Sequence, residues 1–380
     1  MQFKLFNLIF YMGIATVAYF NIYFRDIGLT STQIGNINSL GKGAALVLLP
    51  LWGMISDYYK VNKRLLIAAL GGTIIFSLSL LLTQEFLWIA AIMVAFFIFL
   101  TPIVPLVDAQ LLGYLGDEGE QYGKYRIWGS VGFMIVVSAV GWFLEETNPS
   151  NLFYISGAAF MLALFISFKL PKGDVRLKIG SFSKFKLLFK QKSLLAFVVF
   201  EFFIYLTLNV YNVFFPIYFM DQGGGETLVG IALMIAAGSE LAVFYFSDEI
   251  IERFKLRYIF LLSTIAFVFR WFILFFYPQP MIILTSQLLH SLTFGLFHVT
   301  SVNFINIISG KRFRATGQNL YAAVKEVSAI ISGTLGGLLY DSLGGNNLFL
   351  MLSIIALVAG SAYFLVLNYQ AKKSEYGEKI

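Results

Sequence analysis

The sequence predicts an all-α polytopic membrane protein with 12 transmembrane helices, arranged as two six-helix pseudo-repeat bundles. Three observations support this prediction. Of the 380 residues, 58% are hydrophobic and only 13% are charged, whereas about a quarter of the residues of a soluble domain are charged. The apolar residues gather in runs of about 20, the length that spans a bilayer as a helix. One long polar stretch separates six such runs from six others.

Each predicted helix is an apolar run bounded by charged residues, glycine or proline. The first follows MQFKLF without a small-residue cleavage site, so we expect it to be retained as a helix and not removed as a signal peptide. The twelve runs lie at residues 4–24, 32–56, 64–83, 86–113, 124–145, 151–170, 193–219, 227–247, 257–277, 280–309, 316–340 and 347–369. Because their number is even, both ends of the chain lie on the same side of the membrane.

The basic residues indicate which side this is. With a cytoplasmic N-terminus, 22 of the 27 Lys and Arg residues fall in cytoplasmic segments, and only Arg25 falls on the outer side. Cytoplasmic loops of membrane proteins carry such an excess. The other four basic residues lie inside predicted helices, at Lys42, Arg126, Arg270 and Lys325. We therefore expect a multi-pass protein of the cell (cytoplasmic) membrane with both termini in the cytoplasm.

The long polar stretch also sets the predicted domains. We expect an N-terminal bundle over residues 1–170, a cytoplasmic linker over 171–192, a C-terminal bundle over 193–369 and a cytoplasmic tail over 370–380. Apolar residues alternate with lysines in the linker, which is typical of a segment on the membrane surface; they are Phe182, Phe185, Leu188 and Phe189. Two six-helix halves are the layout of transporters built from internal repeats.

Charged side chains within the predicted helices are the main candidates for function. A lone charge in the apolar part of a membrane is costly, so such residues usually face partners or a water-filled interior. Asp108 lies near the end of one predicted helix and Arg126 near the start of the next, and we interpret them as an ion pair or as two halves of a polar site. Glu240, Arg270 and Lys325 belong to the same class of intramembrane charges.

Polar residues also recur on one face of three predicted helices, because residues three or four apart lie above one another in a helix. The seventh helix carries Glu201, Tyr205, Asn209 and Asn212; the tenth carries Gln287, His290, Phe294, His298 and Ser301; the eleventh carries Tyr321, Lys325, Ser328 and Ser332. We expect these faces to point away from lipid. Glu201 is expected near the inner end of its helix, where water reaches it, which makes it a weaker candidate.

Two motifs carry a resemblance to known transporters. The stretch from Gly53 through Asp57 to Lys60, Lys63 and Arg64 resembles the signature loop of the major facilitator superfamily, although Tyr58 stands where a basic residue is usual. Residues 102–108 and 122–133, with Glu240, Arg270-Trp271, His290, Thr293-Phe294 and His298, resemble the phenylpropionate permease family. The likeness extends more distantly to lactose permease and its group of oligosaccharide and nucleoside proton symporters.

This resemblance implies the major facilitator fold and roles for particular residues. For substrate binding they are Asp108, Arg126, Trp128, Phe133, Asn209, Asn212, His290, Tyr321 and Lys325; for proton coupling Asp108, Glu240, Arg270 and His290; and for conformational gating Gly53, Asp57, Lys60, Lys63 and Arg64. The chain departs from lactose permease at Phe133, Asn209, Asn212 and Thr293, where that protein has a Trp and three acidic residues. The proton-handling scheme of lactose permease therefore does not transfer residue by residue.

We thus expect a secondary active transporter, a proton-coupled symporter that imports a small organic solute by alternating access. The solute is sugar- or nucleoside-like, or arylpropionate-like, since rings stack well on aromatic walls. The alternative is a proton-coupled exporter of drugs or metabolites. The predicted fifth helix favours import, because GSVGFMIVVSAVG lacks the proline that is usual in antiporters of this superfamily.

The remaining classes lack support in the sequence. There is no cysteine, no HExxH metal motif and no glycine-rich phosphate loop, which argues against an enzyme and against ATP-driven transport. We expect no cofactor, no metal and no nucleic-acid partner. The expected partners are the solute, protons and the lipid bilayer, and we expect the chain to act as a monomer.

Overall fold

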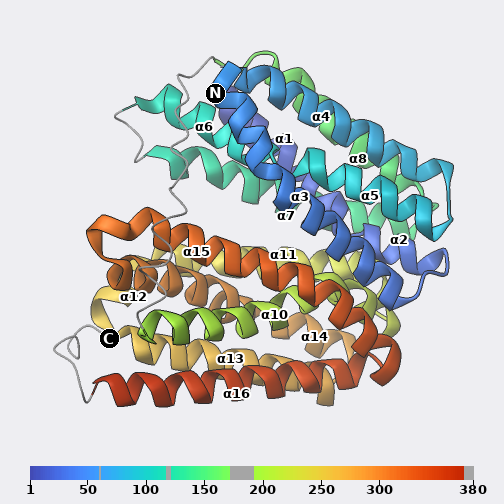
Figure 1. Cartoon of the computed structure of the whole chain (residues 1–380). Helices are drawn as coiled ribbons and strands as arrows, with labels where there is room; N and C mark the ends of the chain where they lie inside the picture. Colours follow the sequence, from blue (N-terminus) through green and yellow to red (C-terminus); the bar gives the residue numbers. More distant parts are fainter. Residues whose placement is uncertain (60, 117–120, 172–191, 372–380) are drawn as a thin grey trace. The chain divides into compact units, whose positions relative to one another are not determined.

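The computed structural model describes residues 1–59, 61–116, 121–171 and 192–371, and these residues form helices without a strand (Figure 1). Eleven helical segments among them are long and apolar enough to cross a membrane, judged by length and composition, and one more is apolar but shorter. Together they match the twelve predicted runs. Most of the predicted linker and tail lies outside the described residues, as do all four apolar linker residues.

The first half of the chain contains the helices up to residue 167. They are α1 (Gln2–Val17), α2 (Phe20–Asp26), α3 (Ser31–Tyr59), α4 (Asn62–Ser79), the short 3₁₀ helix η1 (Leu80–Leu82), α5 (Phe86–Leu100), α6 (Ile103–Leu115), α7 (Tyr122–Glu145) and α8 (Asn151–Ser167). Two predicted helices are each divided into two α-helices, α1 with α2 and α5 with α6. The break between α5 and α6 falls at Pro102, which has no N–H group to continue the helical hydrogen bonds.

The second half contains α10 (Lys192–Asp221), α11 (Gly225–Tyr245), α12 (Ser247–Arg253), α13 (Leu256–Phe276), α14 (Pro280–Ser286), the 3₁₀ turn η4 (Gln287–Leu289), the π-helix η5 (Ser291–Leu296), α15 (Phe297–Leu343) and α16 (Gly345–Ala371). The predicted tenth helix is therefore not regular. Its last part continues into the eleventh as α15, with a kink at Gly310, where φ is 66° and ψ is 168°. Glycine adopts this left-handed φ without a steric penalty.

Contacts divide the chain into two units, one of Met1–Lys178 with Pro216–Met234 and the other of Ile179–Phe215 with Ile235–Ile380. The first unit thus takes in the end of α10 and the start of α11. Tyr19 helps to hold them, since its buried hydroxyl donates to the Val137 carbonyl oxygen (2.5 Å) and lies 3.4 Å from that of Glu226. The Glu145 carboxylate accepts the Thr227 N–H at 3.1 Å.

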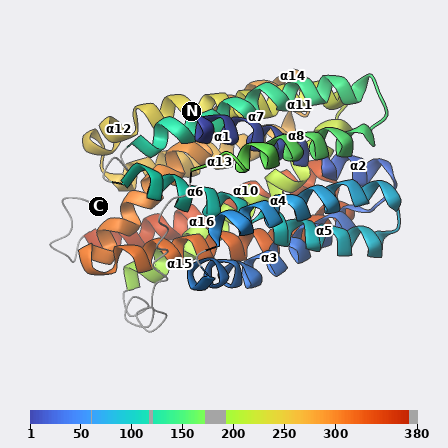
Figure 2. The ribbon, with the colours of Figure 1, turned by 90° about the horizontal axis from the view of Figure 1, so that it is seen from above.

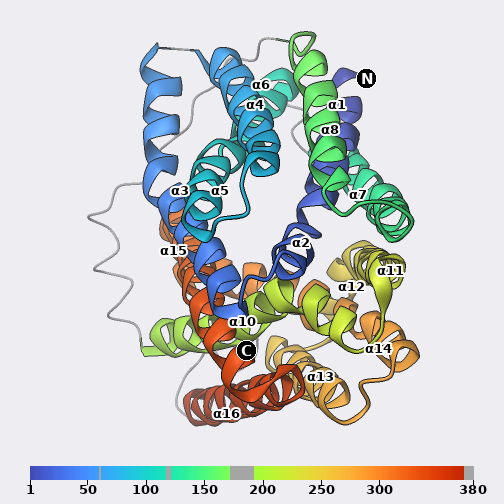
Figure 3. The same ribbon diagram turned by 90° about the vertical axis from the view of Figure 1, so that its right-hand side faces the viewer.

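In the first unit α1 packs against α7 and α8, and α4 packs against α5 and α8, as Figures 2 and 3 show for α4 and α5. Glycine makes the closest of these approaches possible. A Cβ atom on Gly132 of α7 would overlap the backbone carbonyl group of Leu8 in α1. Small residues play this role widely in membrane proteins, where packing rather than the hydrophobic effect holds helices together.

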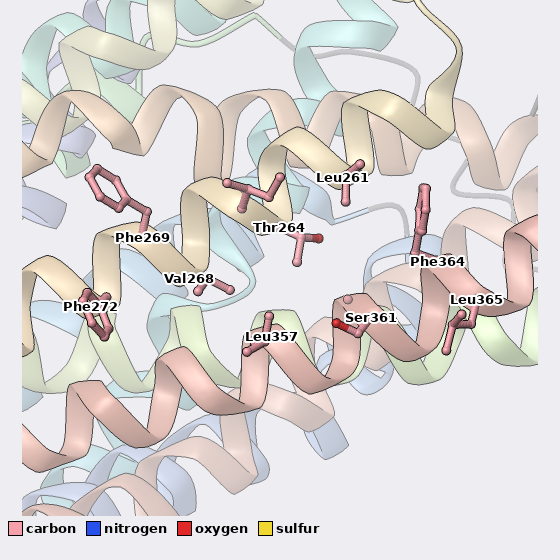
Figure 4. A pocket seen from close by; sticks show the side chains of 11 residues that line it. Leu261, Thr264, Val268, Phe269, Phe272, Leu357, Ser361, Phe364 and Leu365 are labelled. Atoms are coloured by element: carbon pink, nitrogen blue, oxygen red, sulfur yellow. The ribbon is translucent and has the colours of Figure 1, made fainter.

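In the second unit α13 and α16 run side by side (Figure 1). A bond from the Ser353 hydroxyl to the Val268 carbonyl oxygen joins them at 3.0 Å. An apolar groove of about 610 Å³ lies along this pair, and Figure 4 shows Val268, Phe272 and Leu357 among the side chains that line it. Deeper in the unit, aromatic rings fill the core, with Phe200 stacked on Tyr363 at 4.3 Å between centroids.

Replacing Gly132 by alanine tests the close approach of α1 and α7. The added methyl group meets a backbone atom of Leu8, which cannot rotate aside, so the helices must separate. We expect a loss of about 1–3 kcal/mol of stability, seen as a lower midpoint of thermal unfolding of the purified protein in detergent. Gly123→Ala in the same helix is the matched control, because its methyl group meets no atom within 4 Å. Equal midpoints for the two variants would contradict the assignment.

Candidate functional site

Arg270 of α13 lies at the centre of a polar cluster inside the second unit. Its side chain is 0% exposed. One terminal nitrogen, Nη1, contacts His290 Nδ1 at 2.7 Å and Thr293 Oγ1 at 3.0 Å. The other, Nη2, donates to the Tyr211 hydroxyl at 2.8 Å and to Gln287 Oε1 at 2.6 Å. The guanidinium also lies 4.5 Å from the centre of the Tyr211 ring, and its Nε atom is buried without a hydrogen-bond partner among the described residues.

The irregular backbone of residues 287–296 presents three of these partners to Arg270. Gln287 lies in the 3₁₀ turn η4, His290 lies between the two irregular segments, and Thr293 lies in the π-helix η5. In these segments the helical period differs from 3.6 residues, which turns successive side chains away from their usual directions. Short π-helical segments occur often at functional sites.

The contact with Arg270 also determines which ring nitrogen of His290 carries the proton. A guanidinium only donates hydrogen bonds, so His290 Nδ1 must accept and the ring proton lies on Nε2. Nε2 is 2.9 Å from Oε1 of Glu240 in α11, and it donates to that carboxyl group. The three side chains form an ordered row, Arg270 to His290 to Glu240. Glu240 and His290 remain slightly exposed, at 17% and 12%, so a proton can reach the acidic end of the row.

A column of stacked rings continues from His290. The rings of His290 and Phe294 are 5.5 Å apart, and those of Phe294 and His298 are also 5.5 Å apart and nearly parallel. Tyr321 stacks on His298 at 5.9 Å. The side chains from His290 to His298 thus lie on one face, as predicted for the tenth helix, although a 3₁₀ turn and a π-helix, and not a regular α-helix, carry the first part of that face.

A second polar cluster surrounds the far end of this column. Tyr321 and His298 Nδ1 are 2.7 Å apart, and the hydroxyl groups of Tyr205 and Tyr321 are 2.7 Å apart. The Lys325 ammonium lies over the rings of Tyr205 and Tyr321, at 5.0 and 5.2 Å from their centres. Such cation–π contacts stabilise a positive charge without a carboxylate partner.

Asn209 and Asn212, the two amides of the predicted stripe in α10, differ in their surroundings. The Asn209 side chain is half-buried and donates to the Ser328 hydroxyl at 3.0 Å. Asn212 is exposed. Of these two amides, only Asn209 has a described hydrogen bond to a neighbouring helix.

In the first unit, Asp108 of α6 and Arg126 of α7 are half-buried neighbours, but the predicted ion pair between them does not form. They interact electrostatically, and no N–O distance of 4.0 Å or less joins these two described residues. Aromatic neighbours explain the difference. The Tyr122 hydroxyl group hydrogen-bonds to the Asp108 carboxyl group, and the Arg126 guanidinium stacks on the Tyr11 ring at 4.1 Å. The alternative interpretation, two halves of a polar site, stays a prediction.

The other predicted site residues of the first unit are more dispersed. Trp128 is 40% exposed and Phe133 is half-buried. Lys63 of the signature-like loop donates to the carbonyl oxygens of Phe168 and Leu170, both at 2.8 Å, and so ties the start of α4 to the end of α8. Gly53 lies inside α3 and Arg64 is exposed. The side chains of Asp57 and Lys60 lie outside the described part of the chain.

Glu201 and Tyr211 of the second unit have surroundings that the sequence does not predict. Glu201 was expected near water, but it is 1% exposed, because Ser301 and the aromatic core cover it. Tyr211 was not singled out, although it contacts both Arg270 and Gln287. Its position two residues after Asn209 places it on another side of α10, so the polar stripe did not reveal it. Within the described residues, no group of three or more His, Asp or Glu side chains is arranged to hold a metal.

Known proteins resemble this chain over most of its length. Residues 1–351 match the model of the MFS_1 like family. The chain is 27% identical to maltose permease of Geobacillus stearothermophilus, covering 96% of this chain and 93% of the relative. It is 26% identical to a probable 3-phenylpropionic acid transporter of Escherichia coli (strain K12), covering 90% of each.

Among solved structures, the nucleoside transporter NupG superposes with a TM-score of 0.83 over 96% of this chain and 98% of the other. At 17% identity this likeness concerns the fold. It confirms the predicted all-α architecture of the major facilitator type. The chain therefore belongs to the MFS_1 like family, and it is a secondary active transporter of the major facilitator superfamily and not an enzyme.

Proposed function

We propose that this transporter is a proton-coupled symporter that imports a small organic solute, and that Glu240 carries the coupled proton. The row from Arg270 through His290 to Glu240 is the observation that supports this proposal most strongly. It places one ionisable carboxyl group, partly accessible, at the end of a hydrogen-bond array that is otherwise largely buried.

Protonation of Glu240 would change the energy of this array in a definite way. An ionised Glu240 accepts the Nε2–H of His290 and balances the buried charge of Arg270. A neutral Glu240 leaves that charge without its counter-ion, which favours a different arrangement of the surrounding helices. A proton that binds one conformation more tightly than another shifts their equilibrium by the difference in binding energy. This is the minimum that coupling requires.

The solute class follows from which groups remain available. Four of the five N–H groups of Arg270 donate within the protein, and the side chain is buried, so it is a poor partner for an anionic solute. We therefore favour a neutral ring-shaped solute with hydroxyl groups, sugar- or nucleoside-like, over an arylpropionate. Candidate contacts are Asp108, Arg126, Trp128 and Phe133 in the first unit and Asn209, Asn212, Tyr321 and Lys325 in the second.

The names of similar proteins include both solute classes, sugar- or nucleoside-like and arylpropionate-like. Those relatives are a maltose permease, a xanthosine permease and a probable 3-phenylpropionic acid transporter. An arylpropionate would need a cation, and Lys325 is a partly buried cation of the second unit that lies outside the Arg270 array.

Further parts of the proposal concern placement and gating. We propose that the protein lies in the cell membrane as a monomer with both termini in the cytoplasm, on the strength of its basic residues. We also propose that the loop from Gly53 to Arg64 takes part in gating. The bonds from Lys63 to the end of α8 support a structural part for this loop, because a cation stabilises the carbonyl end of a helix.

Uptake into proteoliposomes tests the symport proposal directly. With an imposed pH gradient, acidic outside, we expect a sugar or nucleoside from a panel to accumulate above its external concentration. A gradient of one pH unit is worth about 1.4 kcal/mol for each proton, or about tenfold accumulation. The panel includes 3-phenylpropionate, and accumulation of that anion instead would overturn the assigned solute class. Solute movement that responds to neither pH nor sodium would overturn symport.

Replacing Glu240 by glutamine separates coupling from translocation, with the solute that the panel identifies. The amide keeps the shape of the carboxyl group but cannot exchange a proton. We expect accumulation to fall from about tenfold per pH unit to none, while counterflow exchange of the solute continues. Glu252→Gln, at an exposed position in α12, is the matched control and should accumulate solute normally. Loss of counterflow together with accumulation in Glu240→Gln would contradict the assigned role.

A further inference from the structure

A second buried acid, Glu201 of α10, lies apart from the Glu240 array. Its Oε1 atom accepts a hydrogen bond from the Ser301 hydroxyl. Its Oε2 atom is buried and has no hydrogen-bond partner among the described residues. No described ion pair within 4.0 Å includes Glu201. An ionised carboxylate with a single hydrogen bond is costly to bury, whereas a protonated carboxyl group avoids the charge.

Titratable groups face Glu201 from three helices. Tyr205 comes from α10 itself, Tyr363 from α16, and Tyr321 and Lys325 from α15, and each interacts electrostatically with Glu201. Lys325 is the one cation of this set that acts electrostatically on Glu201. It lies over the two tyrosine rings and not against the carboxyl group. The charge of Lys325 is therefore near enough to stabilise Glu201 when it is transiently ionised. No fixed ion-pair partner among the described residues holds Glu201 in the ionised form.

Hydroxyl groups connect Glu201 to His298. Ser301 bonds to Glu201 and also interacts with the Tyr321 hydroxyl, which lies 2.7 Å from His298 Nδ1. Hydroxyl groups both donate and accept, so a proton can move along this row. When Glu201 is protonated, its O–H group donates to the Ser301 oxygen in place of the bond from Ser301, and the Ser301 hydroxyl turns to donate to Tyr321. The Glu201 proton then passes to Ser301, the Ser301 proton to Tyr321, and the Tyr321 proton to His298 Nδ1. A carboxylate and an imidazolium are left, and no other atom is gained or lost.

We propose that Glu201 is a second proton-binding site of this transporter, separate from Glu240, and that Ser301 and Tyr321 connect it to His298. The use of this proton in transport rests on the proposed function, whereas its binding does not. The two sites lie at different levels of the same column of rings. His290 at one end contacts Glu240, and His298 two turns along the chain contacts the hydroxyl row.

Infrared difference spectroscopy of the purified protein in lipid vesicles tests proton binding without a solute. The probe is the proton itself, varied by pH and replaced by deuterium. We expect the wild type to show the C=O stretch of a protonated carboxyl group that shifts in heavy water and disappears as the pH rises. Glu201→Gln should lose the Glu201 component of this band and keep the component of protonated Glu240. Glu240→Gln and the exposed control Glu252→Gln should keep the Glu201 component.

Ser301→Ala provides a second variant that leaves the carboxyl group in place. Glu201 then loses its one hydrogen bond, so the band should move to higher frequency, and deuterium should exchange into it more slowly. A band absent from the wild type would overturn the proposal, because Glu201 would then be ionised. A band that neither pH nor heavy water changes would also overturn it, because the proton would then be only structural.

These experiments can refute either proposal without refuting the other. If Glu240→Gln still accumulates solute, proton coupling through Glu240 is wrong, yet the Glu201 band is unaffected. If the Glu201 band is missing while Glu240→Gln loses accumulation, only the second site is wrong.

Discussion

The second unit is organised by the need to bury the charge of Arg270. A guanidinium inside a membrane protein must find acceptors within the protein, because neither lipid nor bulk water supplies them there. Four acceptors from two segments of the chain meet it: Tyr211 of α10 and Gln287, His290 and Thr293 of the irregular segment. Removing any one leaves a buried donor without a partner, so their positions depend on one another.

This arrangement has chemical consequences beyond stability. Because Arg270 can only donate, it leaves His290 with its single proton on the side that faces Glu240. The imidazole then serves as a rigid connector between a permanent cation and an ionisable acid. A change of protonation at Glu240 is therefore transmitted to a buried charge two side chains away, with no need for His290 itself to titrate.

The broken segment between α14 and α15 allows this geometry. Irregular backbone at membrane depth is tolerated where protein or a polar interior satisfies it, and here it lies in the same segment as the partners of Arg270. A regular helix from 280 to 309 would space Gln287, His290 and Thr293 at three-residue steps, which drift around the helix by about 60° each time. The 3₁₀ turn removes that drift between Gln287 and His290, because it has three residues per turn.

The sequence by itself determined the class of protein, the twelve apolar segments and the membership of a transporter family. These follow from composition, run length and short motifs, which are local properties of the chain. It also identified Glu240, Arg270 and His290 as intramembrane polar groups, since the free-energy cost of a polar side chain in an apolar run is evident from the sequence. Their residue types alone did not say which of them touch.

Only the tertiary structure decided the pairings. Asp108 and Arg126 were predicted as partners because they are opposite charges on successive helices, yet each lies against a tyrosine instead. Glu201 was placed near water by its distance from the helix end, yet side chains from α15 bury it. Periodicity within one helix defines a face, but the neighbour that covers that face comes from a segment about a hundred residues away. That neighbour decides whether a charge is paired, stacked or buried with a proton.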